Sequence, residues 1–188
     1  MSTPRLPTTP DVPVVRTDFS DQEAWERVKA GISWQTPDEF EANVTYVDDP
    51  AFAGLTAAEL LESWPDRASH SLLLVVDETT IRSAEHPILV VDPDEDEDDE
   101  DDEDDEDDED DDEDDEDDDE DGPDRPAFRS FRAVPHTIQE IENNLSIANM
   151  DWEDFADDID DDGVRREHML YGRIEEVTAN MAVDQATE

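Results

Sequence analysis

An unbroken run of 28 acidic residues, at positions 94–121, restricts the fold of this 188-residue chain more than any other feature. Neighbouring carboxylates repel one another, and the run holds no apolar side chain whose burial could offset the entropy lost on ordering. We therefore expect these residues to form a disordered, extended segment. The fold must come from the residues on either side.

Charge and apolar residues are unevenly distributed between the acidic run and the remainder. Of the formal net charge of −49, the run supplies −28 and all other residues together supply −21. The remainder holds every apolar residue and is long enough for one hydrophobic core, but short for two. We predict a single domain over residues 12–164, interrupted by a polyacidic insertion at 93–124. A flexible arm at 1–11 precedes the domain, and a tail with helical signals at 165–188 follows it.

The pattern of apolar residues and turn formers predicts the secondary structure. Five strands are expected, over residues 12–17, 42–47, 72–76, 88–92 and 127–134. Three capping boxes, each a hydroxyl residue followed three positions later by glutamate, predict helix starts at Ser20, Thr56 and Thr137. We expect Asn149 to end the third helix in a left-handed conformation, and Asp151 to begin a fourth over 152–159.

The order of these elements predicts the fold class. Strand–helix–strand units give parallel neighbours with right-handed crossovers, whereas consecutive strands without a helix between them pair antiparallel. We therefore predict an α/β fold, with a mixed, mainly parallel sheet of about five strands and flanking helices. The acidic run then forms a long disordered loop in the connection between the last two strands.

Composition also excludes several classes of protein. The acidic balance argues against direct binding to nucleic acid or to anionic membranes, because both need basic patches. Apolar stretches such as 72–76 are far shorter than the roughly 20 residues that span a bilayer. The N-terminus lacks the apolar core of a secretory signal, and there is no cysteine. We expect a cytoplasmic protein without a cofactor.

Four aspartates, Asp18, Asp48, Asp77 and Asp92, lie at or just beyond predicted strand ends. In open α/β sheets, ligands bind at the carboxyl ends of parallel strands, where converging carboxylates could hold Mg²⁺ or act as acid and base. The competing interpretation is that aspartate simply ends strands and starts turns. No glycine-rich phosphate loop accompanies these residues.

A second candidate set lies in and after the helix expected to begin at Thr137. Asparagine is a poor helix former, yet Asn143 and Asn144 occur inside this helix. A recognition surface would use Asn143, Asn144 and Asp151. The structural alternative is that Asn144 bonds nearby backbone, while Asn149 and Asp151 mark helix ends.

Residues 158–163 match the opening D-x-D-x-D-G of a calcium loop, with Asp158, Asp160 and Asp162 as potential ligands. The twelfth position should be glutamate but is Met169, and Arg165 and Arg166 bring positive charge into the loop. We therefore prefer a plain helix-terminating turn and predict no metal here.

One segment carries a family resemblance. Residues 141–152, with the sequence IENNLSIANMDW, and Phe155 and Ala156 after them resemble a bacterial family of small proteins known only as a domain of unknown function. Residues 16–21, 46–54 and 86–92 resemble its other hallmarks. The resemblance covers roughly residues 12–164 apart from the acidic run, and it implies no activity. This chain departs from the family pattern in its acidic run and in the tail beyond residue 164.

Two functional hypotheses follow from the sequence. The leading one is a non-enzymatic acidic binding or regulatory module that sequesters a basic protein partner, because no catalytic constellation is recognisable. The alternative is a small metal-assisted enzyme built on the strand-end aspartates. The acidic run itself has three interpretations. It is a solvated segment that keeps the protein soluble, a segment that attracts basic proteins electrostatically, or a segment that binds divalent cations weakly.

Overall fold

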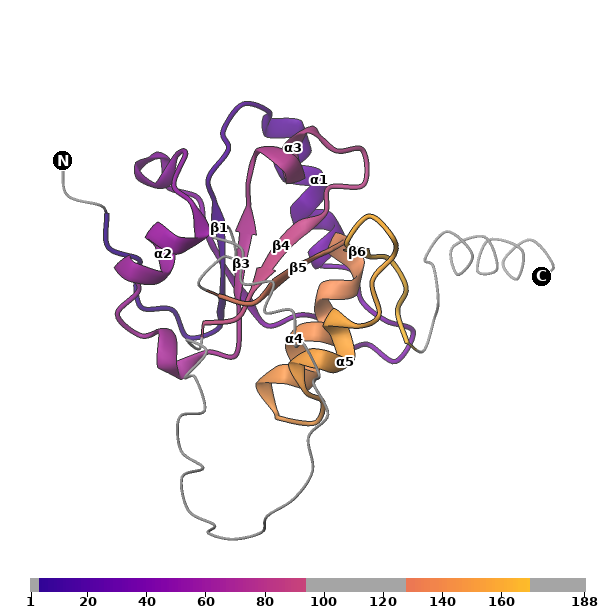
Figure 1. Cartoon of the computed structure of the whole chain (residues 1–188). Coiled ribbons are helices and arrows are strands. Elements are labelled where there is room, and N and C mark those ends of the chain that lie inside the picture. Colours follow the sequence, from indigo (N-terminus) through magenta and orange to yellow (C-terminus); the bar gives the residue numbers. More distant parts are fainter. Residues whose placement is uncertain (1–3, 94–127, 170–188) are drawn as a thin grey trace, which may run out of the picture.

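A computed structural model describes residues 4–93 and 128–169, which form a six-stranded sheet in the order β2-β1-β3-β4-β5-β6 (Figure 1). Parallel pairs join β1 (Val12–Arg16) to β2 (Val44–Val47) and to β3 (Leu73–Val76). Antiparallel pairs join β3 to β4 (Ile88–Val91) and β4 to β5 (Ser130–Ala133). The predicted mixed α/β sheet is confirmed. Its sixth strand, β6 (Val164–Arg165), pairs parallel with β5 and is too short to leave a sequence signal.

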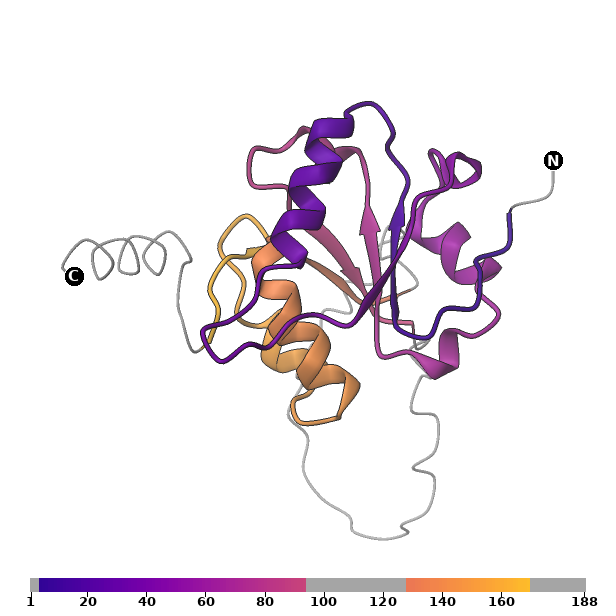
Figure 2. The same cartoon turned by 180° about the vertical axis from the view of Figure 1, so that it is seen from behind.

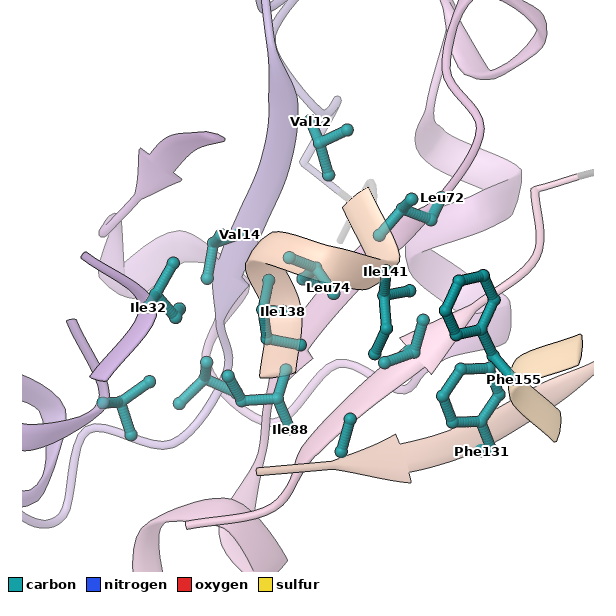
Figure 3. Packing of buried hydrophobic residues seen from close by; sticks show 14 of the residues in the cluster. Val12, Val14, Ile32, Leu72, Leu74, Ile88, Phe131, Ile138, Ile141 and Phe155 are labelled. Carbon is teal, nitrogen blue, oxygen red and sulfur yellow. The ribbon is translucent and has the colours of Figure 1, made fainter. Parts of the chain in front are cut away.

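Helices cover both faces of the sheet. The larger core lies under α1 (Gln22–Ile32), α4 (Ile138–Ser146) and α5 (Trp152–Ala156), where Ile138 and Ile141 pack towards Val14 and Leu74 (Figures 2 and 3). The second core lies under α2 (Ala57–Ser63) and contains Val15 and Val75. Neighbouring strand residues thus enter opposite cores, because successive side chains of a strand point to opposite faces. Both faces are apolar, which explains the continuous apolar runs of the central strands.

Helix starts agree with the sequence at Thr56, Thr137 and Asp151 and differ at Ser20. Thr56 forms the predicted capping box with Glu59, and Asp151 begins α5. The start predicted at Ser20 is wrong, because the neighbouring Asp21 accepts the N–H groups of Glu23 and Ala24 instead. Thr137 precedes α4 as predicted, but the capping box expected there is wrong, because the Thr137 side chain forms no cap hydrogen bond.

Thr137 lies in the single turn η3 (Pro135–Thr137), its backbone is already helical, and its hydroxyl donates to the Val134 carbonyl. Glu140, its expected partner in the capping box, is buried and forms an ion pair elsewhere. The left-handed residue after α4 is Ala148, with φ 51°, rather than Asn149.

The packed part of the chain is longer than the predicted domain of 12–164. Leu6 is buried in the second core, and its N–H donates to the Ser63 carbonyl, so the arm expected at 1–11 is anchored there. At the other end, Arg165 and His168 are buried. A short helix that the sequence did not indicate, α3 (Glu78–Arg82), and two single turns, η1 (Pro50–Phe52) and η2 (Arg67–Ser69), complete the described elements.

The acidic run is inserted into the β4–β5 hairpin. The ladder continues past the paired residues Val91 and Ser130, because the Asp92 N–H donates to the Arg129 carbonyl at 3.0 Å. The Arg129 side chain also donates to the Asp92 carboxylate, with Nε to Oδ2 at 3.0 Å. The two ends of the insertion are therefore held together by the fold. Disorder is predicted at 93–124 and a tail at 165–188. Of these residues, the structure describes only Pro93 and 165–169, and the others lie outside the described residues.

None of the helices among the described residues has both the length and the apolar character needed to cross a membrane.

Candidate functional site around helix α4

The strand-end aspartates divide between the two edges of the sheet. Asp18, Asp48 and Asp77 follow the parallel strands β1, β2 and β3, so they share the carboxyl-end edge. Asp92 follows the antiparallel strand β4 and lies at the opposite edge. Three of the four candidates are therefore brought to one edge, as the parallel topology requires.

Asp48 is held by side chains of its own chain. Its Oδ1 accepts from Arg16 Nη1 at 3.2 Å, and its Oδ2 accepts from Trp25 Nε1 at 3.1 Å. Arg16 is buried, and its guanidinium lies 4.4 Å from the centroid of the Phe19 ring. With both carboxylate oxygens engaged, Asp48 links β1, β2 and α1 and has a structural role.

Asp18 and Asp77 are likewise occupied. Asp18 Oδ1 accepts the N–H of Ser20 at 2.7 Å. Asp77 caps α3 through the N–H of Thr80, and its Oδ2 accepts from Arg132 Nη2 at 2.6 Å. Burial opposes the ionisation of Asp77, but the hydrogen bonds and charge of Arg132 outweigh it, so its pKa lies below the ordinary value. Within residues 4–93 and 128–169, no group of three or more acids and histidines could hold a metal ion.

The calcium-like segment binds arginines. Asp158 accepts from Arg165 at 2.6 Å, while Asp160 and Asp162 both accept from Arg166, at 2.8 and 2.7 Å. Hydrogen bonds donated by Arg166 lower the pKa of Asp162, and the carboxylates that accept them raise the pKa of Arg166. Gly163, with φ 77°, donates its N–H to the Asp160 carbonyl and closes a turn between α5 and β6. The predicted turn is therefore present, but it does not end the helix, because α5 stops at Ala156 rather than at the predicted residue 159.

The asparagines of α4 are engaged in local contacts. Asn144 Nδ2 donates to the Glu140 carbonyl at 2.8 Å, which is the backbone bond of the structural alternative. Asn143 Nδ2 donates to the Glu41 carbonyl at 3.1 Å and ties α4 to the segment before β2. Asp151 caps α5. Whether these three residues recognise a ligand stays a prediction.

Two clefts of about 240 Å³ flank α4, and each contains a buried glutamate of that helix. The first is lined by Phe40, Gln139, Glu140, Asn143, Ile147 and His168, so its exposed rim is apolar and its floor is polar. The second is lined by Asp11, Asn43, His70, Ser71, Glu142 and Ser146, together with Pro10, Val12 and Ser69, and is polar throughout most of its wall.

In the first cleft, Glu140 belongs to a buried charged cluster. Its Oε2 accepts from Arg165 Nη2 at 3.2 Å, and its Oε1 accepts the N–H of Met169 at 2.9 Å. Burial raises the pKa of Glu140, although the charge of Arg165 opposes this shift. Burial and the same arginine lower the pKa of His168. This cluster fixes the C-terminal end of the domain against α4.

In the second cleft, Glu142 accepts hydrogen bonds from neutral donors. Its Oε2 accepts the N–H of Asn43 at 2.9 Å, and its Oε1 accepts from Ser146 Oγ at 3.0 Å. The Ser146 hydroxyl lies 3.1 Å from that of Ser71. The ring of His70 stacks on Trp64, with 5.2 Å between the centroids. Four parts of the chain, at residues 10–12, 43, 69–71 and 142–146, line this cleft.

Neither buried glutamate was among the residues selected from the sequence. The spacing of Thr137 and Glu140 instead predicts a capping-box role for Glu140. A usable signal exists for Glu142, because it lies four residues after Ile138 and three before Leu145, on the apolar face of α4. A glutamate at such a position must either be paired or serve a function.

Residues 11–168 match a family model described as a domain of unknown function, DUF6924. The chain belongs to this family. The match covers all six strands and, apart from Pro10, both clefts beside α4, and the family description names no activity. Searches of curated proteins and of solved structures found no match.

Proposed function

We propose that this DUF6924 protein is a non-enzymatic acidic binding module whose partner is a basic protein. One observation carries the proposal: the domain uses most of its own positive charge internally. At least seven of the ten lysines and arginines at 4–93 and 128–169 form ion pairs with acids of the same chain. The surplus of acidic side chains therefore remains for a partner.

The excess of negative charge is large both in the described residues and in the acidic run. The described residues contain 28 acidic and 10 basic side chains, a net charge of −18, and the acidic run adds −28. Charge of one sign on this scale attracts oppositely charged macromolecules over long distances and raises association rates. A basic protein that otherwise binds nucleic acid is a fitting partner, because the run presents carboxylates at a density comparable to that of phosphates.

The strand-end aspartates support this choice over the metal-assisted alternative. Asp48 and Asp77 each bind an arginine of the same chain, and the Asp18 carboxylate binds local backbone. As part of the proposal, we set the module in a bacterial cytoplasm, the setting favoured by the family resemblance and the cysteine-free sequence.

Affinity capture from cell lysate with two baits tests the proposal. One bait is the full chain, and the other carries asparagine and glutamine in place of the acids at 94–121. We expect a basic protein that the full chain retains at low salt and releases at moderate salt, and that the neutralised bait retains weakly. The captured protein, once purified, should form a saturable complex in titration calorimetry. If no salt-sensitive basic protein is retained, or if both baits retain it equally, the proposal is wrong.

A further inference from the structure

We infer that the cleft around Glu142 binds the side-chain cation of a lysine or arginine, and that it is the anchor point of the domain for its basic partner. This inference rests on the proposed function and assigns part of it to one carboxylate. Glu142 is 3% exposed, lies in the cleft wall, and has no cation among the described residues beside it.

Glu142 differs in this respect from every other buried charged residue in the described part of the chain. Arg16 pairs with Asp48, Asp92 pairs with Arg129, and Glu140 and Arg165 pair with each other. Removing a carboxylate from water costs several kcal/mol unless an opposite charge and good hydrogen bonds offset it. Glu142 has the hydrogen bonds, but no lysine or arginine at 4–93 or 128–169 supplies an opposite charge.

The hydrogen bonds orient the carboxylate without neutralising it. They come from the Asn43 backbone and amide and from the Ser146 hydroxyl, all of which are uncharged donors. Such donors hold the oxygen atoms in fixed positions and leave the full negative charge available. A cation that enters the cleft would therefore meet a preorganised acceptor, which limits the entropy cost of binding.

The other walls also suit a cation. The cleft is lined by the hydroxyl residues Ser69, Ser71 and Ser146 and by Asp11, with His70 stacked on Trp64, and no lysine or arginine of the described residues lines it. An ammonium group carries three N–H donors and a guanidinium carries five, and neither accepts hydrogen bonds, so a wall of oxygen acceptors can satisfy them. The same wall repels phosphate and carboxylate ligands.

An organic cation fits this cleft better than a metal ion. A hard divalent cation needs several oxygen ligands at one point, and the described residues provide no group of three acids or histidines suitable for one. A volume of about 240 Å³ instead accommodates a long, thin side chain with its charged end at Glu142. The occupant is therefore a lysine or arginine side chain of the partner.

The test is a titration of the ¹⁵N-labelled full chain with Nα-acetyl-lysine methylamide at constant ionic strength. We expect saturable chemical-shift changes at the amides of Asn43, Ser71 and Ser146. The norleucine analogue, which lacks the ammonium, should produce none. Glu142→Gln should weaken binding by about tenfold or more, because a charge-assisted hydrogen bond is lost. The matched control is Glu62→Gln, which removes an equal charge from an exposed position of α2 and should leave the affinity unchanged.

A second variant guards against misfolding of Glu142→Gln. Ser69→Tyr adds bulk from an exposed residue of the cleft wall and should also abolish the shifts. Binding that survives both variants, or an equal response to the norleucine analogue, would overturn the inference. Failure here is distinct from failure of the proposed function, because the acidic run could retain a basic protein without the cleft. Conversely, the cleft could bind the lysine probe even if no basic protein were captured.

Discussion

Arg165 is a single residue whose contacts hold the last described residues of the chain against α4 and α5. Its side chain is fully buried, pairs with Glu140 and Asp158, and lies with its guanidinium 5.2 Å from the centroid of the Phe155 ring. Its Nε has no hydrogen-bond partner within the part of the chain that the structure describes. Because a buried ion pair is expensive to form and more expensive to break, the two partners depend strongly on each other.

We predict that Arg165→Met lowers the free energy of unfolding by about 3–5 kcal/mol, since it leaves the Glu140 carboxylate buried without a counter-charge. Urea denaturation followed by circular dichroism measures the change. Adding Glu140→Gln to this variant should recover part of the loss, because the uncompensated charge is then gone.

The control for this prediction is Arg82→Met, which breaks an exposed pair with Glu78 on α3. Exposed pairs of this spacing contribute about 0.3–0.5 kcal/mol, so a small change is expected. If Arg165→Met and Arg82→Met lowered the free energy of unfolding equally, the buried pair would contribute no more to stability than the exposed one.

At the scale of elements, the β4–β5 hairpin explains how the fold tolerates a long polyanion. Its ladder ends in the Asp92–Arg129 pair, which is closed by both backbone and side-chain hydrogen bonds. The strands are therefore registered by their own contacts and do not depend on the length of the connection between them.

We predict that deletion of residues 94–121 leaves the fold intact and leaves the free energy of unfolding unchanged or raised. A shorter loop costs less closure entropy, by about 1 kcal/mol, and the repulsion within the run is removed. Chemical denaturation and the amide spectrum of the domain provide the measurement. A glycine–serine segment of the original length serves as the control that separates charge from length. Loss of cooperative unfolding on deletion would contradict the prediction.

The strands and α2 were predictable from sequence because their signals are local. The apolar run at 72–76 marks β3, and Thr56 and Glu59 form their box within a single turn. Glu140 was misassigned because its partner, Arg165, lies 25 residues away in the sequence. Ser20 was misassigned because the adjacent Asp21 competes for the same N–H groups. Short-range sequence patterns cannot predict which side chain forms a hydrogen bond when its partner is distant in sequence or when a neighbouring residue competes for the same donor.

The candidate site was less predictable than the fold for the same reason. Topology placed Asp18, Asp48 and Asp77 at one edge, as the sequence indicated, but the arginines that occupy Asp48 and Asp77 come from β1 and β5. Only the folded sheet brings these side chains together. The two clefts also depend on contacts between α4 and distant segments, such as that between Glu142 and Asn43.

At the scale of the whole molecule, the charge consists of buried ion pairs and a large excess of exposed acidic side chains over basic ones. The buried pairs, such as Arg165 with Glu140, are shielded from salt by their surroundings, whereas exposed acids are screened. Added salt should therefore act mainly on the surplus negative charge. It relieves repulsion within the protein and weakens attraction to a basic partner at the same time.

We predict that raising sodium chloride from about 0.05 to 0.5 M stabilises the full chain against urea, because the screening length falls well below the roughly 10 Å that applies at 0.1 M. The variant with asparagine and glutamine at 94–121 should gain less, since the run contributes −28 of the total charge. Over the same range, the affinity for the basic partner should fall. Opposite trends in stability and affinity would show that salt acts by screening the excess negative charge. If salt acted only by strengthening the burial of apolar surface, it would stabilise the full chain and the neutralised variant equally. It would also leave the partner bound.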